Sequence, residues 1–152
     1  MKKILVSACL LGLDCRYDGK NCYIGKIEEL KKHAVLIPVC PEQMGGLPTP
    51  RVPAEIQGER LISREGTDVT SNYEKGAEMA LKIAQINGCD MALLKQKSPS
   101  CGHGRIYDGS FSSNIIEGEG NTTKLLLNNG IRCYSDEEID DLLKVLVDKK
   151  AS

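Results

Sequence analysis

The sequence predicts an α/β fold: a single-domain parallel sheet with helices on both faces, as in Rossmann-like or flavodoxin-like three-layer sandwiches. Short apolar runs alternate along the chain with segments whose apolar residues recur at helical spacing. The runs are apolar almost throughout, which is typical of parallel strands buried on both faces. The chain has 152 residues, of which 41% are hydrophobic and 27% charged. This size and composition suit one domain, which we expect to span residues 1–150.

The first third of the chain predicts a strand–helix–strand unit. Residues 4–9 form an apolar, partly β-branched run that suits a buried strand. Residues 24–30 carry apolar side chains at helical spacing, and residues 34–39 are the next buried strand. Residues 41–53 contain four prolines and two adjacent glycines, so we expect an extended, turn-rich loop without a regular element.

The middle of the chain predicts a short strand, a long helix and a further buried strand. The short strand covers residues 60–63. Ser71 and Glu74 have the spacing of a capping box, which predicts the start of a helix, and Gly88 predicts its end. Residues 91–94 are apolar and form the next strand.

The last third predicts a loop, two helices and a final strand between them. Residues 98–104 combine Pro, Ser and Gly and cannot be helical. We expect a helix over residues 122–129 and a strand over residues 131–134. Ser135 and Glu138 predict a second capping box, which opens the terminal helix.

Chemically active side chains follow three of the predicted strands. Cys9 ends the first strand, Cys40 and Glu42 follow the second, and residues 98–101 follow the strand at 91–94. Parallel sheets bind ligands beyond the carboxyl ends of their strands. We therefore expect these residues to meet at one edge of the fold.

The seven cysteines point to thiol or metal chemistry, because a chain in a reducing compartment does not need so many for packing. No two have the C-x-x-C spacing of zinc ribbons, thioredoxin-like pairs or ferredoxins. Cys89 and Cys133 lie beside or within apolar strands and are expected to pack as small hydrophobic residues. Cys9, Cys40 and Cys101 lie among Gly, Pro and small polar residues. Three converging thiolates can hold zinc or an iron-sulfur cluster, and the spacing does not decide between them.

Five polar residues of the same loops are candidates for substrate chemistry. Glu42 is the carboxylate best placed to act as a general acid or base, with a solvated surface side chain as the alternative. Ser98 and Ser100 either position a substrate or satisfy turn amides. Arg16 and Arg51 either grip an anionic group such as a phosphate or form ordinary salt bridges.

Charge and hydropathy limit the partners. The formal net charge of -1 lacks the basic excess of proteins that hold nucleic acid by phosphate neutralisation, although a nucleotide-sized ligand stays open. The glycine-rich helix start at residues 118–123 could cradle a phosphate. No run approaches the roughly 20 apolar residues of a membrane span, and the first apolar run is too short for a signal peptide. We therefore expect a cytoplasmic protein without a membrane partner.

Three sequence blocks carry a resemblance to a known family. They are residues 7–19, from Ser-Ala-Cys-Leu-Leu-Gly to Arg-Tyr-Asp-Gly; residues 38–51, from Pro-Val-Cys-Pro-Glu to Pro-Arg; and residues 95–102, with Ser-Pro-Ser-Cys-Gly. In this order, and over nearly the whole chain, they resemble the short thiouracil desulfidases of the TudS type. The resemblance implies a [4Fe-4S] cluster bound by only three cysteines, which serves to remove sulfur from thiolated uracil compounds.

Carried onto this chain, the resemblance implies Cys9, Cys40 and Cys101 as cluster ligands, with the fourth iron open to the substrate sulfur. Glu42 and Ser98 fall where the catalytic acid/base of the family and its assisting serine would lie. The implied substrate is a thiolated nucleobase or nucleotide, such as thiouracil or 4-thiouridine monophosphate. The implied reaction is non-redox and yields the oxo compound plus sulfide.

Two alternatives stay open. Cys15 also belongs to the matching blocks and is the chief rival for a ligand position. The protein could instead be a non-enzymatic metal- or nucleotide-binding sensor, with zinc or no metal among its thiolates. The sequence does not predict the oligomeric state.

Overall fold

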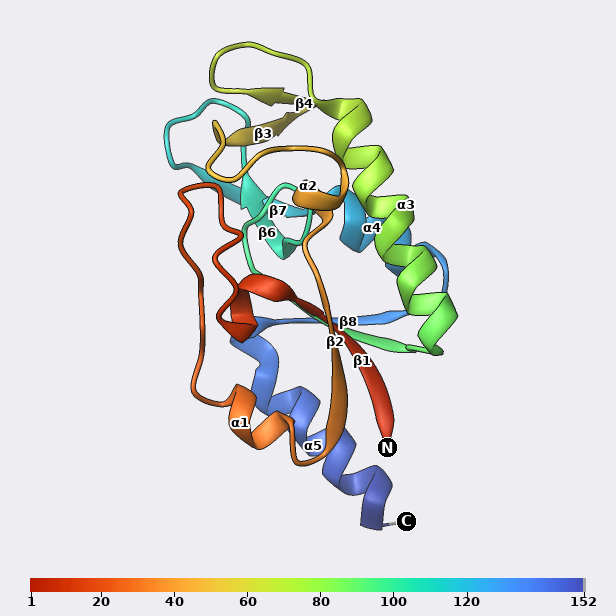
Figure 1. The fold of residues 1–152 in the computed structure, drawn as a ribbon. Coiled ribbons are helices and arrows are strands. Elements are labelled where there is room, and N and C mark those ends of the chain that lie inside the picture. The colour runs from red at the N-terminus through yellow and green to blue at the C-terminus, as the bar shows by residue number, and fades with distance from the viewer. Residues whose placement is uncertain (152) are drawn as a thin grey trace.

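The fold is built on a four-stranded sheet in the order β2-β1-β5-β8, in which all neighbours are parallel (Figure 1). The computed structural model describes the backbone of residues 1–151 and the side chains of residues 1–148. The strands are β1 (Lys2–Ser7), β2 (Ala34–Val39), β5 (Met91–Leu94) and β8 (Arg132–Ser135). Each of these strands was expected from its apolar run.

Helices cover both faces of the sheet (Figure 1). One face packs against α1 (Ile27–Leu30) and α5 (Ile139–Ala151), and the other against α3 (Thr70–Asn87) and α4 (Asn121–Asn128). The predicted three-layer α/β arrangement is confirmed. Within residues 1–151, no helix combines the length and the apolar composition needed to cross a membrane.

Alternating side chains of β1 separate two hydrophobic cores. Ile4 and Val6 are buried in one cluster with Leu142 of α5, whereas Leu5 is buried in the other cluster with Ala80 of α3. Each fully buried aliphatic side chain contributes about 1.5–3 kcal/mol relative to its exposed state. Because both faces of the strand are covered, successive residues are all apolar.

Two antiparallel hairpins lie outside the main sheet. They are formed by β3 (Ala54–Gln57) with β4 (Arg60–Ser63) and by β6 (His103–Tyr107) with β7 (Ile115–Glu119). The sequence predicted only β4 among these strands. The buried carboxylate of Glu55 in β3 accepts the N–H of Gly109 at 2.9 Å, which ties the first hairpin to the β6–β7 loop.

Residues 41–53 do not form a loop throughout, so this part of the prediction is wrong. The segment begins with a one-turn helix, α2 (Pro41–Met44), preceded by Cys40 in an extended conformation. Pro41 occupies the first turn, where its missing N–H costs no hydrogen bond and its fixed φ suits a helix. A proline that was taken to exclude a helix therefore begins one.

The start of α3 also differs from the prediction. The helix begins at Thr70, and no side chain caps it in the capping-box manner that was expected of Ser71 and Glu74. Asp68 instead accepts the N–H of Thr70 at 2.9 Å. The end at Gly88 is confirmed, with the left-handed φ of 70° that favours glycine.

The second capping box is confirmed. Ser135 accepts the N–H of Glu137 at 3.2 Å, and Glu138 accepts the N–H of Ser135 at 3.0 Å. These bonds open the short 3-10 turn η2 (Asp136–Glu138), which leads directly into α5. They satisfy N–H groups that a helix start leaves without partners.

The ends of β1 and β2 place two cysteines outside the sheet. β1 ends at Ser7, two residues earlier than predicted, and Cys9 lies on a 3-10 turn, η1 (Ala8–Leu11). Cys40 lies between the end of β2 and the start of α2. The predicted helix over residues 24–30 is reduced to the single turn of α1.

Candidate functional site

A cavity of about 420 Å³ lies at the carboxyl ends of the parallel strands. Five cysteines line it: Cys9, Cys15, Cys22, Cys40 and Cys101. The predicted meeting of the loops that follow β1, β2 and β5 is therefore confirmed. Cys89 and Cys133 do not line this cavity and are buried in the hydrophobic core, as expected.

Three thiols of the cavity wall, those of Cys15, Cys40 and Cys101, have raised pKa values, which favours their neutral form. Burial raises the pKa of Cys101 to about 12, although hydrogen bonds from Ser100 and Ser7 lower it. The contact of Cys15 with Cys40 lowers the pKa of Cys15. Its contact with Cys9 and its burial together raise that pKa by more, so the net result is a pKa raised to about 11. The pKa of Cys40 is raised, first by Cys15 and then by burial. A metal that binds here must displace these protons.

These thiols surround the cavity from separate segments of the chain. Among the described residues, no three His, Cys, Asp or Glu side chains converge closely enough to hold a single metal ion. A [4Fe-4S] cluster makes a different demand, because each cysteine binds a different iron at its periphery. The donor set of soft sulfur atoms around an open space fits such a cluster.

The loop after β5 forms a tight turn around one serine hydroxyl. Ser98 Oγ accepts the N–H of Ser100 at 3.2 Å and the N–H of Cys101 at 3.1 Å. The two serine hydroxyl oxygens are 3.0 Å apart. Ser98, Ser100 and Cys101 all line the cavity. The backbone thus fixes the Ser98 oxygen. Because the Ser100 hydroxyl donates to Cys101 Sγ at 3.5 Å, the Ser98 hydroxyl is the donor between the two serines.

The amino terminus of α4 holds this turn in place. The N–H groups of Thr122 and Thr123 both donate to the carbonyl of Ser100, at 2.9 and 3.2 Å. A side chain at Gly120 would come within 2.4 Å of the Ser100 carbonyl, so glycine is required for this close approach. The idea that residues 118–123 cradle a phosphate is wrong, because their helix-start amides bind a protein carbonyl instead.

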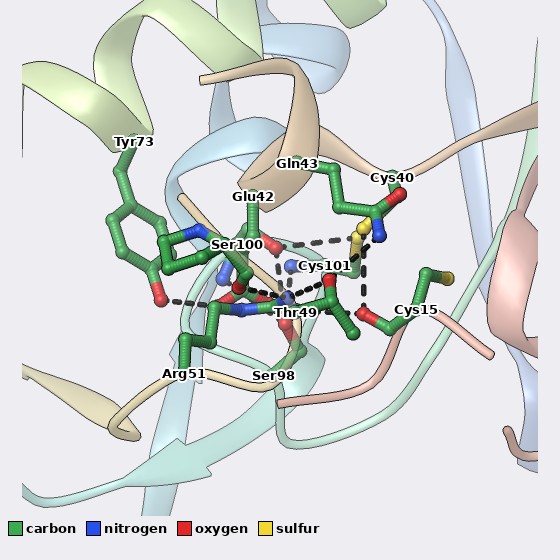
Figure 2. A network of polar contacts seen from close by, with 11 residues as sticks. Cys15, Cys40, Glu42, Gln43, Thr49, Arg51, Tyr73, Ser98, Ser100 and Cys101 are labelled. Atoms are coloured by element: carbon green, nitrogen blue, oxygen red, sulfur yellow. Dashed lines mark hydrogen bonds and ion pairs between the residues drawn. The ribbon is translucent and has the colours of Figure 1, made fainter. Parts of the chain in front are cut away.

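Glu42, on α2, is held by two buried side chains (Figure 2). Its Oε1 accepts a hydrogen bond from the hydroxyl of Tyr73 and lies 3.4 Å from Arg51 Nε. The Glu42 side chain is 16% exposed and that of Arg51 only 4%. Burial by itself lowers the pKa of Arg51, but the Glu42 carboxylate offsets this, and the pKa is raised. Burial, followed by Glu42, raises the pKa of Tyr73.

The guanidinium of Arg51 is used by the protein itself. Besides Glu42 it donates to the carbonyl of Cys15 at 2.8 Å, to the carbonyl of Pro48 at 3.2 Å and to Thr49 Oγ1 at 3.0 Å. It therefore ties the Cys15 loop to α2. Direct substrate binding by Arg51 stays a prediction, whereas the structural alternative, a salt bridge to a carboxylate, is present with Glu42.

Arg16 lies in the cavity wall with part of its surface exposed. It pairs with Asp18 at 2.6 Å and donates to Cys22 Sγ at 3.5 Å. The cavity wall also contains Arg64, whose guanidinium lies 5.8 Å from the ring centre of Phe111, and Lys97. Arg64 directly follows the predicted strand at 60–63, and Lys97 lies in the block of residues 95–102, but the sequence analysis singled out neither side chain.

Tyr73 is the main contact of the site that the sequence analysis missed. Its position fits the apolar face of α3, which by itself indicates a core residue. One signal was present: Gly76 lies in the interior of a helix, where glycine costs about 1 kcal/mol relative to alanine and usually has a packing reason. That reason is the close approach of α2.

Three comparisons bear on this site. The sequence pattern of the 2-thiouracil desulfurase family matches residues 4–138. The uncharacterised protein YbbK of Bacillus subtilis (strain 168) is 41% identical, and the match covers 92% of this chain and 99% of that protein. The solved structure of the [4Fe-4S]-dependent thiouracil desulfidase TudS is 45% identical, with a TM-score of 0.89, and the match covers 97% of this chain and 99% of that chain.

The fold and the site define an α/β protein with a cysteine-lined cavity at the carboxyl end of a parallel sheet. Within that class, the chain belongs to the 2-thiouracil desulfurase family. The resemblance to thiouracil desulfidases of the TudS type is confirmed.

Proposed function

We propose that this protein is an iron-sulfur-dependent desulfidase that converts thiolated uracil compounds to their oxo forms and releases sulfide. The observation that carries the proposal is one cavity lined by Cys9, Cys40, Cys101, Glu42 and Ser98. Membership of the 2-thiouracil desulfurase family and the likeness to a [4Fe-4S]-dependent desulfidase support it.

Cys9, Cys40 and Cys101 would hold the [4Fe-4S] cluster. They come from three different loops at the same edge of the sheet. Cys15 lies next to Cys9 and Cys40 and is the alternative ligand. When bound, a cluster with three protein ligands supplies an iron that acts as a Lewis acid toward the soft sulfur of a thiocarbonyl group.

The reaction is a hydrolysis without net oxidation or reduction. The carbon–sulfur double bond of the thiocarbonyl is replaced by a carbon–oxygen double bond, and the two hydrogens of water leave with the sulfur as hydrogen sulfide. Glu42 accepts a proton from the attacking water and returns it to the departing sulfur or to a ring nitrogen. Ser98, whose oxygen is fixed by two backbone amides, turns its hydroxyl proton from Ser100 to the substrate and orients it.

The substrate is a small molecule, either a free thiolated base or its nucleotide. A cavity of about 420 Å³ is within the usual range of small-ligand sites. Arg16, Arg64 and Lys97 in the wall offer positive charge for the phosphate of a nucleotide. We place the protein in the cytoplasm, because its seven cysteines are all free and a cluster with an open iron needs a reducing environment.

The first test measures iron and acid-labile sulfide per chain after anaerobic reconstitution. We expect about four of each for the wild type and a loss of both in Cys101→Ser. Cys89→Ser is the matched control, since Cys89 is equally buried but lies outside the cavity, and it should keep both.

The second test is turnover. The reconstituted enzyme should convert thiouracil and 4-thiouridine monophosphate to uracil and uridine monophosphate, as followed by mass spectrometry. Tight binding of these compounds without conversion would contradict the enzyme and indicate the non-enzymatic binding protein. Absence of iron and sulfide from the reconstituted wild type would contradict the cluster.

A further inference from the structure

We infer that Tyr73 is a positioning residue, which acts together with Arg51 to fix the carboxylate of Glu42 for proton transfer. The inference rests on the proposed function and assigns a role to a residue outside the three sequence blocks at residues 7–19, 38–51 and 95–102. Tyr73 does not line the cavity, so it cannot touch a substrate there and acts only through Glu42. Figure 2 shows its hydroxyl reaching Glu42 from α3, on the side away from the cysteines.

Both contacts end on the same oxygen of the carboxylate. Oε1 of Glu42 accepts the Tyr73 hydroxyl and faces Arg51 Nε at 3.4 Å. Two donors that arrive from different elements stop the carboxylate from rotating about its terminal bond. They leave the proton-accepting capacity of Oε2 for the reaction, in a side chain that lines the cavity. Orientation of a catalytic group by fixed partners is a general source of rate enhancement.

The packing of α2 against α3 is built to allow this contact. A Cβ atom on Gly76 of α3 would lie 1.9 Å from the carbonyl oxygen of Pro41, and one on Gly45 would lie 2.0 Å from the carbonyl oxygen of Asn72. The Asn72 side chain also donates to the carbonyl of Gly45 at 2.9 Å. Two glycines therefore let the short helix that carries Glu42 lie directly on the turn of α3 that carries Tyr73.

A third element fixes the tyrosine. The side-chain amide of Asn121, at the start of α4, donates to the backbone carbonyl of Tyr73 at 2.8 Å. The backbone N–H of the same residue donates to the carbonyl of Pro99, in the turn that carries Ser98. Asn121 thus connects Tyr73, which contacts Glu42, to the turn that carries Ser98. The positions of Glu42 and Ser98 are therefore linked through one residue of α4.

The experiment compares two tyrosine hydroxyls that each donate to a glutamate. Tyr73→Phe removes the buried hydroxyl while keeping the ring in its core. Tyr23→Phe is the matched control, because the exposed Tyr23 donates to Glu28 at 2.8 Å outside the cavity. With the reconstituted enzyme and thiouracil, we expect Tyr73→Phe to lower kcat about tenfold, with KM changed less than about twofold. Tyr23→Phe should match the wild type, and all three proteins should contain equal iron and sulfide.

The double variant separates positioning from a general structural effect. In a Glu42→Gln background, which has already lost the base, Tyr73→Phe should lower the residual kcat less than about twofold. A multiplied loss of about tenfold in the double variant would overturn the inference, and so would a single Tyr73→Phe variant with wild-type kcat. If Tyr73→Phe does not fold, Arg51→Lys in the same two backgrounds tests the second contact on Oε1. A loss of kcat that is as large in the Glu42→Gln background as in the wild type would overturn the joint positioning role.

Failure of the proposed function gives a different result. A reconstituted wild type without desulfidase activity overturns both the function and the role of Tyr73. A wild type and a Glu42→Gln variant of equal activity remove Glu42 as the base, and the positioning role falls with it. An active wild type, an impaired Glu42→Gln and an unimpaired Tyr73→Phe remove the positioning role alone.

Discussion

Cys89 and Cys101 lie in the same hydrophobic cluster, between the sheet and the helices α3 and α4, and are 6% and 4% exposed. Cys89 fills the core just after α3 ends. Cys101 accepts a hydrogen bond from the Ser100 hydroxyl at 3.5 Å and lines the cavity together with four other cysteines. Burial therefore does not distinguish a cysteine that only packs from one that lines the cavity. The polar neighbours and the adjoining space make the distinction.

The largest difference in cluster content and turnover should appear between serine substitutions of cavity-lining cysteines and of core cysteines. Cys9→Ser and Cys40→Ser should each lose the cluster and all turnover, because serine is a poor ligand for iron in such clusters. Cys133→Ser, in the core, should keep iron, sulfide and activity. The measurement is iron and sulfide content with the visible absorbance of the reconstituted proteins. A Cys40→Ser variant with full cluster content would move the ligand role to Cys15.

Glutamine substitutions of the two cavity-wall carboxylates, Glu42 and Glu55, should differ almost as much in their effect on kcat. Glu42→Gln should lower kcat by about 10²–10⁴-fold, because an amide cannot accept a proton from water, and should leave the iron content unchanged. Glu55→Gln should stay within about threefold of the wild type, since Glu55 only holds the N–H groups of Gly109 and Phe111 and an amide oxygen can still accept them. Equal losses in the two variants would refute the special role of Glu42.

Substitutions in the hydrophobic core next to the site should lower the free energy of unfolding and leave kcat unchanged. Leu126 of α4 is fully buried, and Leu126→Ala should lower the free energy of unfolding by about 2–5 kcal/mol. Its neighbour Leu127 is 38% exposed, and Leu127→Ala should change that free energy by about 0.5 kcal/mol or less. Urea unfolding measures both. A marked loss of kcat in the folded fraction of Leu126→Ala would show that the core and the site are not separate.

The smallest effect should lie at the start of α3, outside the cavity. Hydrogen bonds from the side chain and backbone of Thr70, followed by Arg60, lower the pKa of Asp68 to about 2. A carboxylate whose pKa is lowered by folding stabilises the protein above its unfolded pKa of about 4, and this stabilisation is lost as the pH falls toward 2. Asp68→Asn should therefore be slightly less stable than the wild type at pH 7. The difference in the urea midpoint should shrink between pH 5 and pH 2, and a constant difference would contradict the assignment.

Elements that depend on local patterns along the chain could be predicted from the sequence, and elements without such a pattern could not. The four strands of the sheet came from local apolar runs, and the box at Ser135 came from a spacing of three residues. The helix at Pro41 was missed because its proline was taken as a breaker, although proline suits a first helical turn. The strands β3, β6 and β7 were missed because short, partly exposed hairpins carry little periodicity.

The sequence by itself determined the three-layer α/β fold, the carboxyl-end edge at which Cys9, Cys40, Glu42 and Ser98 meet, and the family. These depend on residue pattern along the chain and on the rule that parallel strands end at one edge. Only the tertiary structure decided that Tyr73 and Arg51 hold Glu42 and that α4 binds the carbonyl of Ser100. Those contacts join residues that lie 9 to 31 positions apart in the sequence. They depend on the close packing of backbones, and no local periodicity encodes which side chains such packing brings together.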